Sequence, residues 1–327
     1  MPTPCAPRAT IMRILAILSA WLIAFAAQAG AQAATSPILS PDELKAVLSS
    51  PSVTVIDIRP PADYLQGHIP GALSAPYGSW RGPANSPGTL PPLDKLTAQV
   101  RKLGLTPERH AVVVSSGADV TDFGAAARVY WTLKYLGLTQ LSILNGGVQA
   151  WQQAQQSLSQ DAPAQPAPSR YEPRLNTAIK ATQADVLAGT NGGDTRLIDA
   201  RPKNFFEGLV KAPTASVPGT IHGARNVPHS VWFAPGSTRI VSAAEARAIA
   251  AKEFPDAGGD NIAFCNTGHW AATDWFALSE LAGLPNVRMY PESLADWTNA
   301  DQALPMDNAP GRASQISEKF KKLFGNS

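Results

Sequence analysis

Short apolar runs alternate with segments of helical spacing along most of the chain. Such runs predict buried strands, and the periodic segments between them predict helices. Ser40, Pro41 and Glu43 supply an N-cap, a first-turn proline and a capping-box glutamate, so a helix should begin at Pro41. In the first half we also expect strands at 53–57, 111–114 and 141–144, a short helix and turn over 64–72, and helices over 93–103 and 123–136. This alternation predicts an α/β fold in which a mainly parallel sheet is flanked by helices.

The second half of the chain repeats the first. Residues 56–60 (IDIRP) recur as 198–202 (IDARP), and residues 69–72 (IPGA) recur as 221–224 (IHGA). Matches this dispersed indicate a duplicated domain, and the Pro/Ala-rich segment between the copies predicts an extended linker. We therefore expect five parts: a signal peptide at 1–33, a first domain at 34–157, a linker at 158–176, a second domain at 177–309 and a C-terminal tail at 310–327.

The N-terminal segment has the pattern of a secretory signal. Arg8 and Arg13 precede the apolar run 14–27, and small-x-small cleavage sites follow at 27–29 and 31–33. The run is short for a membrane span, although an uncleaved anchor is the alternative. We expect cleavage and a periplasmic location. The mature chain would then keep one of its two cysteines, and an unpaired thiol in an oxidising compartment points to reactivity.

The remaining cysteine, Cys265, stands between a predicted strand and a predicted helix. The apolar run 262–264 suits a buried strand, and helix-favouring residues follow from Ala271. Gly268 allows a tight turn between them. A loop this short directs its amide N–H groups inward, beside the positive end of the helix, and so predicts an anion cradle around the cysteine.

Several kinds of site compete for this cysteine. A phosphatase loop would place an arginine after five intervening residues, but that position is Ala271. Cys265 and His269 have the spacing of half a zinc site, yet the mature chain offers no second thiolate, so we expect no metal. An inert buried cysteine is the third alternative. A thiolate held by amides, which attacks sulfur far better than a thiol does, suits the loop best.

The repeat and this loop together resemble the tandem-domain rhodaneses, sulfurtransferases of the thiosulfate and 3-mercaptopyruvate type that carry sulfane sulfur as a persulfide on a loop cysteine. The resemblance extends over residues 37–310. It implies two tandem rhodanese-like domains, a catalytic Cys265 and no cofactor. It also implies a persulfide-binding loop made of Asn266, Thr267, Gly268, His269 and Trp270.

The same resemblance implies the substrates and the state of the first domain. The substrates would be a small anionic sulfur donor and a thiol or cyanide acceptor, with a dithiol protein as a further candidate acceptor. The first domain should be inactive, because it has Ser116 at the position of Cys265 and a longer loop that runs past Asp119 and Asp122. A non-catalytic module that binds or delivers sulfur or another small anion is the alternative from a different class.

Three charged residues outside the loop are supporting candidates. Asp199 and Arg201 follow a predicted strand, and in a parallel sheet such positions collect at the edge where the active loop lies. The pair either braces the loop or forms a surface ion pair. Arg81 in the first copy either reaches across to an anionic donor or packs in the interface.

His269 and the neutral residues beside the cysteine leave the donor open. His269 is either an imidazolium that favours the thiolate or a partly exposed loop histidine. Thiosulfate-using rhodaneses carry basic residues directly after the cysteine and a further arginine at the position of Phe205, whereas here Asn266 and Thr267 are neutral. These departures put thiosulfate in doubt as the natural donor.

The charge balance excludes some partners. The chain has 27 basic and 25 acidic residues, and two of the basic ones, Arg8 and Arg13, lie in the segment expected to be removed. A mature chain without net charge gives no reason to expect nucleic acid as a partner. An apolar helical face over 316–324 is expected to dock on its own domain rather than contact a membrane, although contact with a membrane or a partner is the alternative.

Overall fold

The computed structural model describes Met1, residues 35–255 and residues 258–310. The chain divides into two compact units after Ala34, and the second unit holds both copies of the repeat. The expected signal peptide and the expected helix over 316–324 lie outside the described residues. Within the described residues, no helix is long and apolar enough to cross a membrane.

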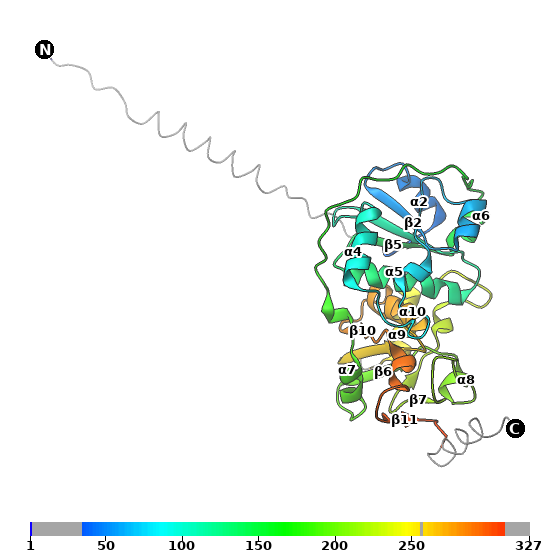
Figure 1. Ribbon diagram of the computed structural model, residues 1–327, viewed down its shortest axis with the longest axis vertical. Coiled ribbons are helices and arrows are strands. Elements are labelled where there is room, and N and C mark those ends of the chain that lie inside the picture. Colours follow the sequence, from blue (N-terminus) through cyan, green and yellow to red (C-terminus); the bar gives the residue numbers. More distant parts are fainter. Residues whose placement is uncertain (2–34, 256–257, 311–327) are drawn as a thin grey trace. The chain divides into compact units, whose positions relative to one another are not determined.

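The first copy is a parallel sheet with helices on both faces (Figure 1). The sheet has five strands in the order β1-β5-β4-β2-β3, and every neighbouring pair is parallel. The elements run β1 (Ile38–Leu39), α2 (Pro41–Val47), β2 (Val53–Asp57), α3 (Pro61–Gln66), β3 (Leu73–Ser74), the 3₁₀ turn η1 (Tyr77–Trp80), α4 (Leu93–Lys102), β4 (His110–Val114), α5 (Val120–Tyr135), β5 (Leu141–Leu144) and α6 (Gly147–Gln153).

The second copy repeats this order with a smaller sheet. Its parallel strands run β10-β9-β6-β8, and a bridge between Lys180 and Met289 stands where the first copy has β1. The elements are η2 (Thr177–Ile179), α7 (Gln183–Gly189), β6 (Thr195–Asp199), α8 (Lys203–Phe206), β7 (Thr220–Ile221), β8 (Arg225–Asn226), η3 (His229–Trp232), α9 (Ala243–Glu253), β9 (Asp260–Phe264), α10 (Trp270–Trp275), the π-helical η4 (Phe276–Leu281), β10 (Val287–Met289), α11 (Ser293–Trp297) and β11 (Met306–Asp307), which pairs with β7 in antiparallel fashion. The predicted α/β fold is therefore confirmed.

The first predicted helix boundary is confirmed. The Ser40 side chain accepts a hydrogen bond from Glu43 N–H, and the Glu43 carboxylate accepts one from Ser40 N–H at 2.7 Å. This capping box satisfies two amide groups that a helix start leaves free. Helix α2 begins at Pro41 as expected.

Two other helices begin three residues earlier than predicted. Pro61 occupies the first turn of α3, where its missing N–H costs nothing. Asp119 is the N-cap of α5, because its carboxylate accepts a hydrogen bond from Asp122 N–H at 2.8 Å. The cap ends the loop after β4, so the loop does not run past Asp119 and Asp122 as predicted.

This shift corrects the alignment of the two copies. Strand β4 ends at Val114 and β9 at Phe264, and both are followed by five loop residues before the next helix. The counterpart of Cys265 is therefore Ser115, not Ser116, and the first copy's loop is no longer than the second's. Either serine leaves the first copy without a thiol at this position.

The two copies share one apolar core. Helix α5 is buried along its middle, from Phe123 to Leu133, and packs against α10 of the second copy (Figure 1). A helix that is buried on all sides must lie between two layers. The interface is therefore a packed interior that fixes side chains of α5 against the second copy.

Candidate active site

Cys265 is the first residue after β9, which lies between β6 and β10. The loop that it opens ends at His269, and helix α10 begins at Trp270. The predicted strand, loop and helix are thus confirmed, with the helix starting one residue earlier than expected. Cys265 is 1% exposed, whereas Asn266 and Thr267 are half-buried. The thiol is therefore covered, but it lies next to residues that reach solvent.

The amide groups of this loop form two sets. The N–H groups of Cys265 and Gly268 each donate a hydrogen bond to Ser293 Oγ at 3.1 Å, which ties the two ends of the turn together. The second set has no hydrogen-bond acceptor among the residues that the structure describes, and it comprises the N–H groups of Asn266, Thr267 and His269. Amide donors left open in a tight turn are what an anion-binding nest requires.

Ser293 is a site residue that the sequence pattern does not indicate. Its hydroxyl also donates to the carbonyl of Tyr290 at 2.8 Å, and its backbone is left-handed, with φ +55°. The counterpart in the first copy is Gly147, with φ +58°. A non-glycine residue in this region is strained by about 1–2 kcal/mol. The second copy therefore carries a strained serine beneath the cysteine loop where the first copy has an unstrained glycine.

Arg81 of the first copy contacts the cysteine loop across the interface between the copies. Its Nη2 donates to the carbonyl of Thr267 at 2.8 Å and to Thr267 Oγ1 at 3.1 Å. Its Nη1 donates to the hydroxyl of Tyr77 at 3.0 Å. The guanidinium is thus engaged by the loop backbone, and its role in binding a donor stays a prediction.

Arg128, on α5, is a second cation from the first copy that touches the loop. Its Nη1 donates to the carbonyl of Gly268 at 3.2 Å, and its Nη2 donates to the carbonyl of Gly88 at 2.8 Å. The side chain is fully buried. No motif marks this arginine in the sequence, because its contact depends on how the two copies pack.

His269 is held in its neutral form. Its Nε2 donates to the carbonyl of Thr121 at 2.8 Å, which leaves Nδ1 to accept from the hydroxyl of Tyr77 at 2.8 Å. Burial, reinforced by the charge of Arg81, lowers the pKa of His269 to about 4. The ring is therefore uncharged at neutral pH, and of the two interpretations the imidazolium is not supported.

Aromatic rings pack around the end of the loop. Trp270 stacks on His229 with ring centroids 5.0 Å apart and meets the edge of Phe205 at 5.8 Å. The guanidinium of Arg201 lies 5.9 Å from the Phe205 ring. Position 205 therefore contributes an aromatic surface to the site.

The Asp199–Arg201 pair is buried, so its interpretation as a surface ion pair is wrong. Arg201 Nη2 lies 2.6 Å from Asp199 Oδ2, and Nη1 reaches Asn266 Oδ1 at 3.4 Å. The first copy has the same buried pair, Asp57 and Arg59, without a cysteine. The pair is therefore a feature of the fold, and its link to the loop is the contact with Asn266.

Asp274, on α10, is a buried carboxyl that forms no ion pair with any described residue. Trp232 Nε1 donates to its Oδ1 at 2.9 Å, and its Oδ2 has no partner among the described residues. Burial raises the pKa of Asp274 well above its ordinary value. Burial therefore favours the protonated, uncharged form of this side chain over the carboxylate.

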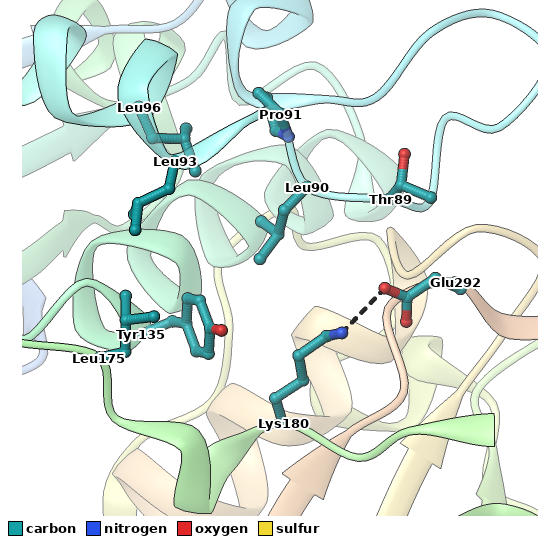
Figure 2. A pocket seen from close by; sticks show the side chains of 9 residues that line it. All are labelled: Thr89, Leu90, Pro91, Leu93, Leu96, Tyr135, Leu175, Lys180 and Glu292. Carbon is teal, nitrogen blue, oxygen red and sulfur yellow. Dashed lines mark ion pairs between the residues drawn. The ribbon is translucent and has the colours of Figure 1, made fainter. Parts of the chain in front are cut away.

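A cavity of about 280 Å³ lies between the two copies, and its lining includes Glu292, the neighbour of the loop-binding Ser293. Figure 2 shows leucines of the first copy on one side of it and, on the other, an ion pair between Lys180 and Glu292 at 3.0 Å. Glu292 directly precedes Ser293, which binds the loop. A second cavity of about 540 Å³ includes Ala295, and Cys265 lines neither of them.

The comparison with protein families agrees with this architecture. The rhodanese-like domain model matches residues 40–154 and 182–300, one match for each copy. Together the two matches cover most of the chain, which therefore belongs to the rhodanese family.

The individual relatives include sulfurtransferases with two different sulfur donors. The chain is 27% identical over 285 residues to the 3-mercaptopyruvate sulfurtransferase of Escherichia coli, covering 84% of this chain and 98% of the relative. It is 29% identical over 264 residues to the thiosulfate sulfurtransferase of Azotobacter vinelandii, covering 80% and 94%. The protein is thus a distant homologue of sulfurtransferases of both types.

Solved structures show the same fold. A crystal structure of a 3-mercaptopyruvate sulfotransferase from Escherichia coli matches with a TM-score of 0.67 at 25% identity, over 79% of this chain and 99% of the other. An anaerobic ergothioneine biosynthesis enzyme from Chlorobium limicola matches with a TM-score of 0.73 at 20% identity, over 84% and 71%. The second match bears on the fold alone.

Gly268→Ala should damage the loop beyond the cost of a left-handed turn. A Cβ at Gly268 would lie 2.2 Å from Arg128 Nη1 and 2.5 Å from the carbonyl of Pro291, and φ is +69°. Strain and overpacking together predict a loss of about 2–5 kcal/mol in unfolding free energy by urea titration. Gly223→Ala is the matched control, with φ +73° and open space, and should lose about 1–2 kcal/mol. Equal losses would contradict the close approach.

Asp274→Asn should stabilise the protein increasingly as the pH rises. The folded state keeps the Asp274 proton while the unfolded chain releases it, so wild-type stability falls with pH above the ordinary carboxyl pKa. The variant has no such proton and should gain about 1.4 kcal/mol per pH unit over wild type until the folded pKa is reached. Urea unfolding at several pH values checks this, with the exposed Asp94→Asn as control. A gain that does not change with pH would contradict it.

Proposed function

We propose that the protein transfers sulfane sulfur from a small anionic donor to a thiophilic acceptor through a persulfide on Cys265. The observation that carries the proposal is the loop itself. Three amide donors stay open beside a cysteine whose own N–H and that of Gly268 are fixed by Ser293. Homology to both types of sulfurtransferase supports the same chemistry.

The reaction balances without an external oxidant. The Cys265 thiolate attacks the sulfane sulfur of the donor, an S–S bond forms, and the donor's bond to that sulfur breaks with its electron pair on the leaving group. The acceptor then attacks the terminal sulfur of the persulfide, and the Cys265–sulfur bond breaks to return the thiolate. The two half-reactions are covalent catalysis of the ping-pong kind.

The donor type is narrowed by the surroundings of the loop. Asn266 and Thr267 are uncharged, and Phe205 contributes an aromatic ring. The cations that contact the loop, Arg81 and Arg128, belong to the first copy and donate to backbone carbonyl groups, so the loop offers the donor no basic side chain of its own. A doubly charged donor such as thiosulfate therefore gains less here than in a loop with basic side chains of its own. Thiosulfate and 3-mercaptopyruvate are the donors to compare.

The alternative from a different class is a module that binds and delivers sulfur without turning over. Such a module would take up one sulfur and hold it for a partner, for example a dithiol protein. Steady-state turnover with a donor and cyanide separates the two, because a delivery module loads once and stalls.

Incubation with thiosulfate or 3-mercaptopyruvate should add one sulfur atom to the wild-type chain and none to Cys265→Ser, as measured by intact mass. The double variant Ser115→Cys with Cys265→Ser is the matched control. It places a thiol at the equivalent position of the first copy, where Gly147 supplies no hydroxyl, and it should stay unloaded. Sulfur retained by Cys265→Ser, or wild type left unloaded by every donor, would contradict the proposal.

We also propose that the protein is exported and acts in the periplasm. The basic residues, apolar run and small-residue sites of the first 33 positions support this. Expression in a Gram-negative host should yield a periplasmic protein whose N-terminus, by sequencing, falls after Ala29 or Ala33. Deleting residues 2–33 should retain the protein in the cytoplasm. An intact N-terminus in the membrane fraction would indicate an anchor instead.

A further inference from the structure

Arg128 is a buried cation with no anionic partner among the described residues. It is fully buried on α5, and it makes no ion pair with any residue that the structure describes. Its Nε has no hydrogen-bond acceptor there either, and its guanidinium lies 5.2 Å from the ring of Trp131. A buried charge is costly unless it is paired, so this arrangement calls for an anion.

The groups that face Arg128 identify where that anion would be. Burial lowers the pKa of Arg128 to about 9, and the charge of Arg81 acts in the same direction. Three groups act oppositely, namely Tyr77, Glu292 and Cys265. Burial raises the pKa of Tyr77, so that group stays neutral at pH 7, and the carboxylate of Glu292 is already paired with Lys180. Cys265 is the third group, and it opens the loop whose Gly268 carbonyl Arg128 binds.

The hydrogen bond from Arg128 also fixes a peptide of the loop. Because a trans peptide points its C=O and N–H in opposite directions, holding the carbonyl of Gly268 turns the N–H of His269 away from Arg128. The preceding peptide is held in the same way, with the Thr267 carbonyl on Arg81 and the Gly268 N–H on Ser293. Arg128 thus orients an open amide of the loop as well as supplying charge.

We propose that Arg128, from the copy without a cysteine, is the positioning residue and counter-charge for the anionic Cys265 of the other copy. This inference rests on the proposed function for its meaning in sulfur transfer. The first copy thereby contributes to the site. The cysteine loop has no basic residue directly after Cys265, and Arg128 on α5 supplies the positive charge instead. The buried charge stabilises the thiolate, and later the persulfide, more than a solvated charge would.

The test measures the thiol rather than sulfur transfer. The alkylation rate of Cys265 by iodoacetamide, an uncharged probe, is recorded against pH for wild type, Arg128→Met, Arg128→Gln and Arg128→Lys. Loss of the charge should move the midpoint of the pH profile up by about one unit, which slows alkylation about tenfold below the midpoint. Arg128→Lys should restore most of the wild-type profile.

Matched controls separate this effect from a general loss of structure. Arg101→Met removes an arginine from α4 that pairs with Glu172 at the surface, and its profile should match wild type. Thermal melting checks that each variant is folded. Should Arg128→Met fail to fold, Arg128→Gln against Arg128→Lys gives the same contrast between a neutral and a charged donor. A folded neutral variant with the wild-type midpoint would overturn the inference.

The result is distinct from that of the sulfur-loading experiment. If wild type takes up no sulfur but the neutral variants still shift the alkylation profile, the proposed function fails and the counter-charge stands. If loading occurs and the profile is unmoved, the function stands and the inference about Arg128 is wrong.

Discussion

The candidate site depends on the five-residue loop 265–269, which residues of both copies hold in place. Ser293 binds the N–H groups of Cys265 and Gly268 from within the second copy. Arg81 and Arg128 bind the carbonyls of Thr267 and Gly268 from the first. Each charge-assisted hydrogen bond contributes about 1.5–3 kcal/mol. The shared apolar core matters to the site because it keeps α5 close enough for these contacts.

The two copies therefore share a fold but contribute different groups to the cysteine loop. Both keep the buried Asp–Arg pair, which identifies it as part of the architecture. They differ beneath the loop, where Gly147 of the first copy corresponds to Ser293 of the second. They differ again in the loop itself, where Ser115 corresponds to Cys265. The first copy supplies cations and the second supplies the thiol, so neither forms the site alone.

Local chemistry was predictable from the sequence, and contacts between distant segments were not. The capping box at Ser40 and the strand before Cys265 depend on neighbouring residues, and both were predicted correctly. The Asp119 cap is also local, and it shifts the alignment of the two loops by one residue from the predicted one. Ser293 and Arg128 act through tertiary contacts, so no spacing marks them. The sequence does not determine the charge of His269, because that charge depends on the hydrogen bond from Tyr77 and on burial between the two copies.

The neutral loop has a physical explanation in this geometry. A lysine or arginine beside the cysteine would extend toward solvent, where water and salt weaken its field. Arg128 is fully buried, and an effective dielectric constant near 20, compared with 80 in water, makes a charge there about four times as effective at the same distance. The proposed counter-charge would therefore act on the cysteine anion without a basic side chain in the loop, whose own residues are Asn266 and Thr267. Arg128 reaches the loop only because the two copies pack together, so the interface between them holds the loop in place.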